Sequence, residues 1–299
     1  MCGITGFFSR TNSINPSKFY KSHLLINHRG PDDEGFFAIQ NNEKNFFKGD
    51  DTIAEIDELS HITSAGPATL LFGHRRLSII DLSQNGHQPY SFDGLYLTYN
   101  GEIYNYIELR KELIELGYEF NTSSDTEVFL KAFHHWGEEA FNKFNGMWAA
   151  AIYRESTDEV ILTRDRFGIK PLYYYLHEGS LYFSSEIRFI LPFIKNIKVN
   201  ESSVYAYLRY CYSNHNDETF FSDIKILLPG HTLVTNSKDF EIKKYFKLTP
   251  APNSNPEDSF KKSLNLRIRS DVELGALLSG GIDSSAIVGK LWENNSNNN

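Results

Sequence analysis

Four short apolar runs, each bounded by turn residues, constrain the fold of this chain more than any other feature. They are Leu95–Tyr99, Met147–Tyr153, Val160–Thr163 and Leu181–Ser185. Runs of this length with turn signals between them are typical of strands that pair with their neighbours in antiparallel sheets. The sequence therefore predicts antiparallel sheet in the N-terminal part of the chain.

Two amphipathic helices are predicted between these strands. The first ends at Gly117, a residue suited to a helix C-terminus. The second begins at Ser124-Asp-Thr-Glu127, which has the pattern of a capping box, and ends before Gly137. The apolar residues at helical spacing are Ile103, Tyr106, Leu109, Leu113 and Leu116 in the first helix and Val128, Phe129, Ala132, Phe133 and Trp136 in the second.

The domain organisation is predicted from length and from one polar segment. A chain of 299 residues is long enough for two domains. Thr249–Pro256 is rich in Pro and Asn and lacks apolar periodicity, which is typical of a linker. We therefore expect a domain over 1–248, a linker over 249–256 and a shorter segment over 257–299. The tail Asn294–Asn299 cannot pack and is predicted to be disordered.

Composition excludes several classes of partner. The net charge of -8 gives no basic footprint for nucleic acid, and the chain has neither a long apolar run nor a signal-peptide pattern. We expect a cytoplasmic protein that binds small molecules, with no nucleic-acid or membrane partner. Of the two cysteines, Cys211 is predicted to be structural, at a buried aromatic helix end. The adjacent His134 and His135 do not have metal-ligand spacing on a helix, so no zinc is expected.

Cys2 is the candidate nucleophile. Aminopeptidases usually remove Met1 before a small residue, and the cysteine amine is then free. An α-amine has an ordinary pKa of about 7.7–8.0, so one residue can supply both the nucleophile and its base at neutral pH. An N-terminal Met-Cys alone is more often without chemistry, and the surrounding motifs decide between the two interpretations.

Met1-Cys-Gly-Ile-Thr-Gly6 resembles the opening of the class II glutamine amidotransferases, which are N-terminal-nucleophile hydrolases. The ordered series of further motifs is similar to that of the asparagine synthetases in this family. This resemblance implies an α+β fold, a four-layer αββα sandwich of antiparallel sheets, followed by the start of an α/β ATP-pyrophosphatase domain. The further segments are Arg29–Asp32, Gly73–Asp81, Tyr99–Asn105, Ser124–Glu127 and Arg164–Leu172.

The resemblance also implies catalytic roles. Cys2 attacks the side-chain amide of glutamine, and Asn100 and Gly101 form the oxyanion hole through a side-chain amide and a backbone N–H. Such donors stabilise the charge that develops on the amide oxygen in the transition state. The alternative for Asn100-Gly101 is a type I′ hairpin turn, which an isolated Asn-Gly between strands favours.

Glutamine also carries an α-carboxylate and an α-ammonium. By resemblance, Arg76 binds the carboxylate in a fork geometry, and Glu102 and Asp125 bind the ammonium. Asp125 follows the capping serine, so the helix N-terminus is expected to keep it ionised. Two further residues, Leu77 and Ile79, contribute backbone groups by resemblance. The remaining motifs, Arg29–Asp32 and Arg164–Leu172, are interpreted as turns fixed by buried ion pairs, and Arg75 is not expected to bind glutamine.

A second site is predicted near the C-terminus. Leu274–Leu278 has the composition of a buried strand, and Ser279–Ser285 resembles the pyrophosphate-binding loop of ATP pyrophosphatases. The alternative is a serine-rich helix cap. The residues predicted to bind ATP are Leu278, Ser279, Gly280, Gly281, Asp283, Ser284 and Ser285, with Asp283 as the ligand of Mg²⁺.

Together these motifs predict a glutamine-dependent asparagine synthase whose synthetase half is incomplete in this chain. Ammonia from glutamine would amidate an ATP-adenylated carboxylate such as aspartate, with ATP and Mg²⁺ needed by that half and no cofactor by the glutaminase half. The alternatives are a stand-alone glutaminase, an acceptor such as a sugar carboxylate, a sugar phosphate or a phosphoribosyl group, and a non-catalytic glutamine-binding fragment. The long stretch Phe36–Leu71 suggests the sugar carboxylate. A homodimer is compatible with any of these interpretations.

Overall fold

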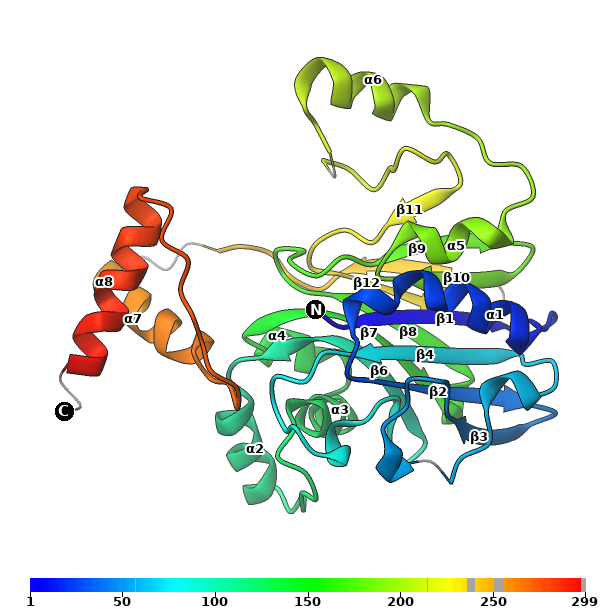
Figure 1. Ribbon diagram of the computed structural model, residues 1–299, viewed down its shortest axis with the longest axis horizontal. Helices are drawn as coiled ribbons and strands as arrows, with labels where there is room; N and C mark the ends of the chain where they lie inside the picture. The colour runs from blue at the N-terminus through cyan, green and yellow to red at the C-terminus, as the bar shows by residue number, and fades with distance from the viewer. Residues whose placement is uncertain (57, 214, 236–239, 250–254, 297–299) are drawn as a thin grey trace. The chain divides into compact units, whose positions relative to one another are not determined.

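The computed structural model describes residues 1–299 except 57, 214, 236–239, 250–254 and 297–299. The chain divides into two compact units, Met1–Lys247 and Leu248–Asn299. Most of the predicted linker 249–256 lies outside the described residues. All named strands belong to the first unit (Figure 1).

Two antiparallel sheets form the centre of the first unit. The larger sheet has the strand order β11-β9-β10-β1-β4-β2-β3, and the smaller has the order β13-β12-β8-β7-β6-β5. The larger sheet contains β1 (Gly3–Ser9), β2 (Asp33–Gln40), β3 (Glu43–Phe47), β4 (Leu70–Arg76), β9 (Tyr173–His177), β10 (Ser180–Ser184) and β11 (Ile224–Ile226). The smaller sheet contains β5 (Tyr90–Phe92), β6 (Leu95–Ile103), β7 (Gly146–Arg154), β8 (Glu159–Arg164), β12 (His231–Thr235) and β13 (Phe240–Lys244).

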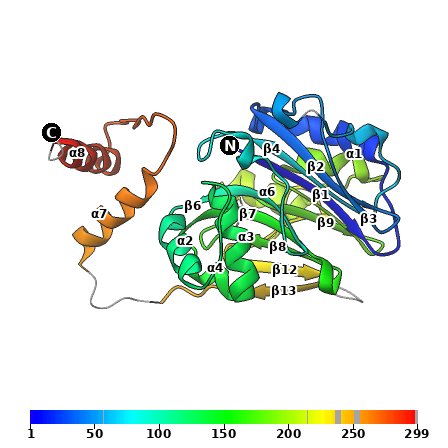
Figure 2. The same cartoon turned by 90° about the horizontal axis from the view of Figure 1, so that it is seen from below.

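Helices cover the outer faces of both sheets (Figures 1 and 2). The helices of this unit are α1 (Pro16–His23), α2 (Tyr106–Glu115), α3 (Asp125–Trp136), α4 (Ala140–Lys143), α5 (Ile187–Ile190) and α6 (Glu201–Tyr210). Short 3-10 turns are η1 (Leu24–Arg29), η2 (Ala54–Ile56), η3 (Ile62–Ser64), η4 (Gln84–Gly86), η5 (Gly137–Glu139), η6 (Glu155–Thr157) and η7 (Leu191–Phe193).

Three buried clusters hold the layers together. One lies between the sheets, where Phe37 and Phe183 of the larger sheet meet Leu162 of the smaller. A second joins the smaller sheet to α2, α3 and α4, and a third joins the larger sheet to α1 and α5. Burial of this apolar surface is the main force that stabilises the stack. The predicted four-layer αββα arrangement and all four predicted strands are confirmed.

The first predicted helix begins later than expected. Ile103 is the last residue of β6, and the helix α2 starts at Tyr106. Ile103 is fully buried as part of the strand. Its distance along the sequence from Tyr106 happens to match the apolar spacing of a helix. Gly117 has a φ of 93°, which is the left-handed conformation that favours glycine after a helix.

The second predicted helix is confirmed as α3, with one correction to its cap. The hydroxyl of Ser124 accepts a hydrogen bond from the Thr126 N–H, as a capping residue should. Glu127 does not return to the Ser124 N–H, which instead donates to the Thr122 hydroxyl. The Glu127 carboxylate accepts from the Asn121 and Thr122 N–H groups and from Lys131, because the preceding loop folds over it.

The prediction for Cys211 is wrong. Cys211 is exposed and has a left-handed φ of 56°, directly after α6. Within α6 only Ser203 is buried, and Leu208 is 76% exposed. The aromatic and apolar residues of this segment predict burial, but they lie on a helix that is mostly exposed.

The second unit contains α7 (Pro256–Arg267) and α8 (Ile282–Ser296). The buried strand predicted at Leu274–Leu278 is wrong, because this run is irregular and Leu277 is 95% exposed. A buried strand needs neighbouring strands, and the described part of this unit supplies none. The tail prediction is partly wrong, since α8 continues through Ser296, while 297–299 lie outside the described residues. No helix in the described part of the chain is long and apolar enough to cross a membrane.

Candidate active site

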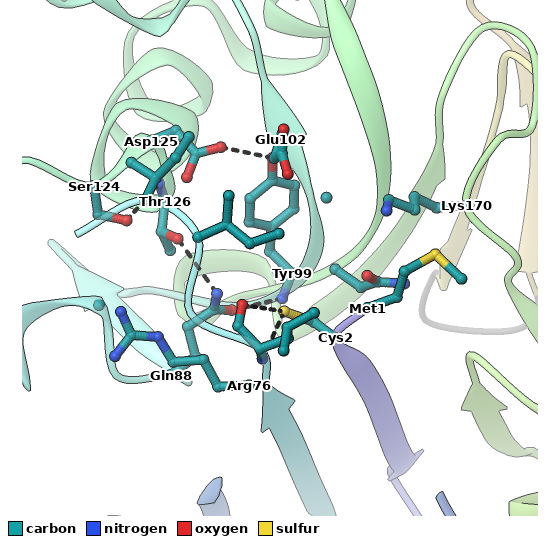
Figure 3. A pocket seen from close by; sticks show the side chains of 16 residues that line it. Met1, Cys2, Arg76, Gln88, Tyr99, Glu102, Ser124, Asp125, Thr126 and Lys170 are labelled. Atoms are coloured by element: carbon teal, nitrogen blue, oxygen red, sulfur yellow. Dashed lines mark hydrogen bonds between the residues drawn. The ribbon is translucent and has the colours of Figure 1, made fainter. Parts of the chain in front are cut away.

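A cavity of about 60 Å³ brings all the predicted glutaminase residues together (Figure 3). Its walls come from the N-terminus, the loop after β4, the end of β6, the start of α3 and the turn after β8. The lining residues are Met1, Cys2, Arg76, Leu77, Ile79, Ile80, Gly86, Gln88, Tyr99, Asn100, Gly101, Glu102, Ser124, Asp125, Thr126 and Lys170.

Cys2 lies directly before β1, which fixes its backbone. Its Sγ is 3.3 Å from the Leu77 nitrogen, which donates to it, and 3.5 Å from the Leu77 carbonyl oxygen. The Cys2 carbonyl accepts from Arg29 Nε at 2.9 Å, and Arg29 also pairs with Glu186 at 3.1 Å. Burial raises the pKa of the Cys2 thiol. The predicted ion pair of Arg29 is confirmed, but its contact with the nucleophile was not predicted.

Asn100 and Gly101 are inside strand β6, opposite Ala149 and Trp148 of β7. The turn interpretation is therefore wrong. Asn100 is buried, and both its Nδ2 and its Oδ1 lack a hydrogen-bond partner among the described residues. Buried amides are almost always hydrogen-bonded in folded proteins. An unpaired amide on a cavity wall is what an oxyanion hole requires, because the substrate supplies the missing partner.

Glu102 and Asp125 form the acidic side of the cavity. Asp125 accepts hydrogen bonds from the Tyr99 hydroxyl and the Ile103 N–H, both at 2.9 Å. Burial raises the pKa of Asp125 to about 6, and burial together with the Asp125 charge raises the pKa of Glu102 to about 6. Burial thus outweighs the predicted effect of the helix N-terminus on Asp125, although a carboxyl with this pKa is still mainly ionised at pH 7.

The two arginines at the end of β4 differ in their surroundings. Arg76 lines the cavity, and its guanidinium donates to the backbone carbonyls of Ser83, at 2.9 Å, and Asp81. Arg75 pairs with Glu34 and with Asp51, each at 2.7 Å, and does not line the cavity. Arg76 therefore lies on the cavity wall, whereas Arg75 ties the stretch Phe36–Leu71 to the sheet through Asp51.

Two further cavity residues, Gln88 and Lys170, were not predicted. The Gln88 side chain accepts from the Tyr99 N–H at 2.7 Å and donates to the Thr126 hydroxyl at 3.3 Å, so it connects β6 to α3. Lys170 was included in a motif that was interpreted as architectural. The expected ion pairs of that motif are wrong for Arg164, whose guanidinium donates to the carbonyls of Lys170, Leu227 and Gly168.

The predicted phosphate loop, Ser279–Ser285, lies in the second unit, and its last four residues form the first turn of α8. The hydroxyls of Ser279 and Ser284 are 3.0 Å apart, and Gly280 has a φ of 82°. Ser279 and Gly280 precede α8 and Ser284 lies in its first turn, and the other residues predicted to bind ATP, Leu278, Gly281, Asp283 and Ser285, are their neighbours in the chain. Asp283 is the only carboxylate in the sequence of this loop, and among the described residues no three His, Cys, Asp or Glu side chains gather as a metal site.

Residues 56–246 match the glutamine amidotransferase domain family, and residues 256–296 match asparagine synthase. The chain belongs to the glutamine amidotransferase family. It is 36% identical over 303 residues to asparagine synthetase [glutamine-hydrolyzing] 1 of Bacillus subtilis, covering 96% of this chain and 43% of that protein. It is 33% identical over 324 residues to putative asparagine synthetase [glutamine-hydrolyzing] 2 of Methanocaldococcus jannaschii, covering 98% of this chain and 57% of that protein.

More distant relatives of this amidotransferase include amidase chry2 of Gibberella zeae, which is 28% identical and of which the chain covers 43%. The chain thus spans about half the length of the curated relatives it matches. The fold matches glutamine phosphoribosylpyrophosphate amidotransferase of B. subtilis with a TM-score of 0.60 at 22% identity, over 83% of this chain and 50% of that one. The predicted resemblance to class II glutamine amidotransferases with an asparagine synthase segment is confirmed.

Proposed function

We propose that this amidotransferase hydrolyses glutamine to glutamate and ammonia at Cys2. The observation that carries the proposal is the buried amide of Asn100, which has no hydrogen-bond partner in the described part of the chain and lines the same cavity as the Cys2 thiol. A thiol beside a group able to donate to an oxyanion is the arrangement that amide cleavage requires.

The reaction begins when Met1 is removed, so that the free amine and the thiol belong to one residue. The neutral amine accepts the thiol proton as Sγ attacks the side-chain carbonyl carbon of glutamine, and Asn100 and Gly101 donate to the resulting oxyanion. The C–N bond then breaks, the amine returns the proton to the leaving nitrogen, and ammonia departs. Water hydrolyses the remaining thioester and releases glutamate.

Arg76, Glu102 and Asp125 select free glutamine. The Arg76 guanidinium pairs with the α-carboxylate, and the two carboxylates on the opposite wall pair with the α-ammonium. Leu77 and Ile79 complete the wall beside Cys2. A neutral amide that lacks these two charges leaves buried ionic groups unpaired, which disfavours its binding.

The ammonia is proposed to amidate a carboxylate that ATP has adenylated, with aspartate as the acceptor. Two observations support this acceptor. Residues 256–296 match asparagine synthase, and the two relatives at 36% and 33% identity are named as asparagine synthetases. Ser279–Ser285 would hold the pyrophosphate of ATP, with Asp283 at Mg²⁺. The asparagine synthase match covers residues 256–296 of this chain, which spans about half the length of these relatives. The long stretch Phe36–Leu71 favours a sugar carboxylate as the second candidate acceptor.

The test is glutaminase activity of the purified chain. We expect ammonia and glutamate in equal amounts from glutamine, loss of at least 10³-fold in rate in Cys2→Ala, and a mass that corresponds to removal of Met1. Cys211→Ser serves as the matched control, because Cys211 is exposed and outside the cavity. Glutamine binding without ammonia release, or equal activity in Cys2→Ala, would refute the proposal.

A further inference from the structure

Lys170 is a buried cation on the wall of the candidate active site. It is 6% exposed and lines the same cavity as Cys2 and Glu102. Figure 3 shows its amino group directed into the cavity, near Glu102 and Met1. No hydrogen bond or ion pair joins its Nζ to any of the described residues. A buried ammonium without a partner is unfavourable, so its position calls for an explanation.

The turn that carries Lys170 is fixed from both sides. The buried carboxylate of Asp165 accepts from the Lys170 N–H at 3.0 Å, and Arg164 Nε donates to the Lys170 carbonyl at 2.7 Å. Asp165 also accepts from the N–H groups of Trp148, Phe167 and Ile169. Gly168 has a φ of 66°, a conformation that glycine adopts without strain. The turn therefore presents one ammonium at a fixed place.

The charges around the first two residues come from several elements. The cations are Arg29 of η1, Arg76 of β4 and Lys170 of the turn after β8. The acidic groups are Asp32 before β2, Glu102 of β6 and Asp125 of α3, with the Tyr99 hydroxyl bonded to Asp125. Arg29 and Arg76 both donate hydrogen bonds to backbone carbonyls. In the proposed reaction Arg76 also binds the substrate carboxylate. Lys170 is the cavity cation to which the proposed reaction gives no role.

Resting on the proposed glutaminase function, we propose that Lys170 is a positioning charge for the nucleophile, whose ammonium favours the neutral amine and the ionised thiol of processed Cys2. Lys170 stays protonated and exchanges no proton with the substrate. The amine still accepts the thiol proton, and the ammonium opposes a second positive charge nearby. The sulfur anion that forms as the proton leaves is attracted to the same ammonium.

The Lys170 charge shifts the pKa values of the thiol and of the N-terminal amine in the direction that this role requires, which is downward. Burial raises the pKa of the Cys2 thiol, and Lys170 is among the groups that lower it again. In the chain that still carries Met1, burial lowers the pKa of the Met1 amine, Arg29 and Lys170 lower it further, and Cys2 and Asp32 raise it. Removal of Met1 moves the amine to Cys2 beside the same cations, so we expect the same direction for the Cys2 amine. Removing the Lys170 charge should therefore raise the pKa of both groups, and more protein would carry a protonated amine at neutral pH.

The experiment compares Lys170→Met and Lys170→Gln with Lys170→Arg, all in a Cys211→Ser background so that Cys2 is the only thiol. Lys44→Met is the matched control, because Lys44 lies on β3 outside the cavity and pairs with Glu155. The pH dependence of Cys2 alkylation by iodoacetamide and of kcat/KM for glutamine are both measured.

We expect both neutral variants to shift the acid limb of the two pH profiles upward by about one pH unit. At pH 7 this shift lowers the alkylation rate and kcat/KM by about tenfold. The loss should diminish above pH 9, while Lys170→Arg and Lys44→Met keep the original midpoint. A loss by the same factor at every pH, or an equal midpoint shift in Lys170→Arg, would overturn the proposal. If the unsubstituted protein releases no ammonia, the glutaminase proposal fails, and the alkylation profiles still decide the role of Lys170.

Discussion

At the scale of single residues, the candidate site combines groups that are poorly satisfied in the protein alone. The amide of Asn100 lacks hydrogen bonds in the described residues, and Glu102 and Asp125 have raised pKa values because of burial. Each of these groups reduces stability, and in the proposed reaction each gains a partner from glutamine. Residues that cost stability without a substrate are typical of binding and catalytic sites.

The first prediction concerns the Asn100 amide. We expect Asn100→Ala to lower kcat for glutamine hydrolysis by about 10²–10³-fold, because one oxyanion donor is lost. The melting temperature should not fall by more than about 2 °C, because the amide has no described hydrogen bond to lose. Steady-state kinetics and thermal unfolding measure the two effects. A loss of kcat below fivefold, or a large fall in melting temperature, would indicate a structural role for Asn100.

The second prediction concerns pH and glutamine affinity. In the proposed binding mode Glu102 and Asp125 pair with the α-ammonium as carboxylates, and burial raises the pKa of each to about 6. Affinity should therefore be constant above pH 7 and decrease as pH falls through 6, since protonation removes the negative charge. We expect Kd to rise about tenfold between pH 6 and pH 5 in inert Cys2→Ala, measured by calorimetry.

The matched variants for this prediction are Glu102→Gln and Glu112→Gln. Glu102→Gln should weaken binding at pH 7.5 and flatten the pH dependence, because one of the two titrating groups is gone. Glu112 is on the surface of α2 and pairs with Lys143, so Glu112→Gln should reproduce the original curve. An unchanged pH dependence in Glu102→Gln would remove Glu102 from the ammonium site.

At the scale of elements, the sequence predicts structure well where local signals and burial agree. The apolar patterns of β7 and α3 are bounded by turn or capping residues in the sequence, and both elements lie where they are predicted. Ile103 was misassigned because one apolar residue at the end of a strand continued the spacing of the next helix. The aromatic run of α6 and the apolar run Leu274–Leu278 are exposed, and composition alone cannot show whether another element covers a segment.

The residues of the candidate site also divide into those that the sequence predicts and those that it does not. Cys2, Asn100 and Asp125 belong to motifs whose family roles were known from the resemblance, and the structure brings them to one cavity. Lys170 and Gln88 could not be assigned, because their roles depend on which side chains the fold places opposite them. A motif rich in charge and turn residues is compatible with both an architectural and a functional role.

The third prediction concerns the β6–β7 pair that carries the oxyanion hole. A Cβ added to Gly101 would contact the Met147 carbonyl oxygen and lie 2.8 Å from the Trp148 Cα. Since backbone atoms of a paired strand cannot move aside, we expect Gly101→Ala to destabilise the fold by about 1–3 kcal/mol or more and to abolish activity. Gly289→Ala is the control, because nothing lies within 4 Å of its added Cβ. Equal melting temperatures of the two variants would contradict this packing.

The fourth prediction concerns the exposed end of α6. Cys211 should react with Ellman's reagent in the folded protein without denaturant, because its side chain is exposed after the helix. Cys211→Ser should remove this fast phase and leave a slower one from the more buried Cys2. Rates of colour development under native conditions measure both thiols. A Cys211 thiol that reacts only after unfolding would restore the original interpretation of a buried helix end.

At the scale of the whole molecule, the first unit contains all the residues to which the proposed glutaminase reaction assigns a role. All three buried clusters and every residue of the cavity lie within Met1–Lys247. The cavity gathers residues from five separate segments, so it exists only when both sheets are packed. Leu248–Asn299 contributes no residue to these clusters or to the cavity among the described residues.

The fifth prediction follows from this division. A chain that ends at Lys247 should have a melting temperature within about 3 °C of that of the full chain. Its kcat for glutamine hydrolysis should be within about twofold, because this truncation removes no residue of the three buried clusters. A chain that ends at Gly230 is the matched control, since it loses β12, β13 and Tyr245, which packs on Trp148 at the centre of the smaller sheet. That variant exposes the edge of β8 and part of two buried clusters, so it should unfold cooperatively at a much lower temperature and lose activity. Calorimetry and ammonia release compare the two. Loss of activity in the longer truncation despite an unchanged melting temperature would show that the second unit takes part in glutamine hydrolysis.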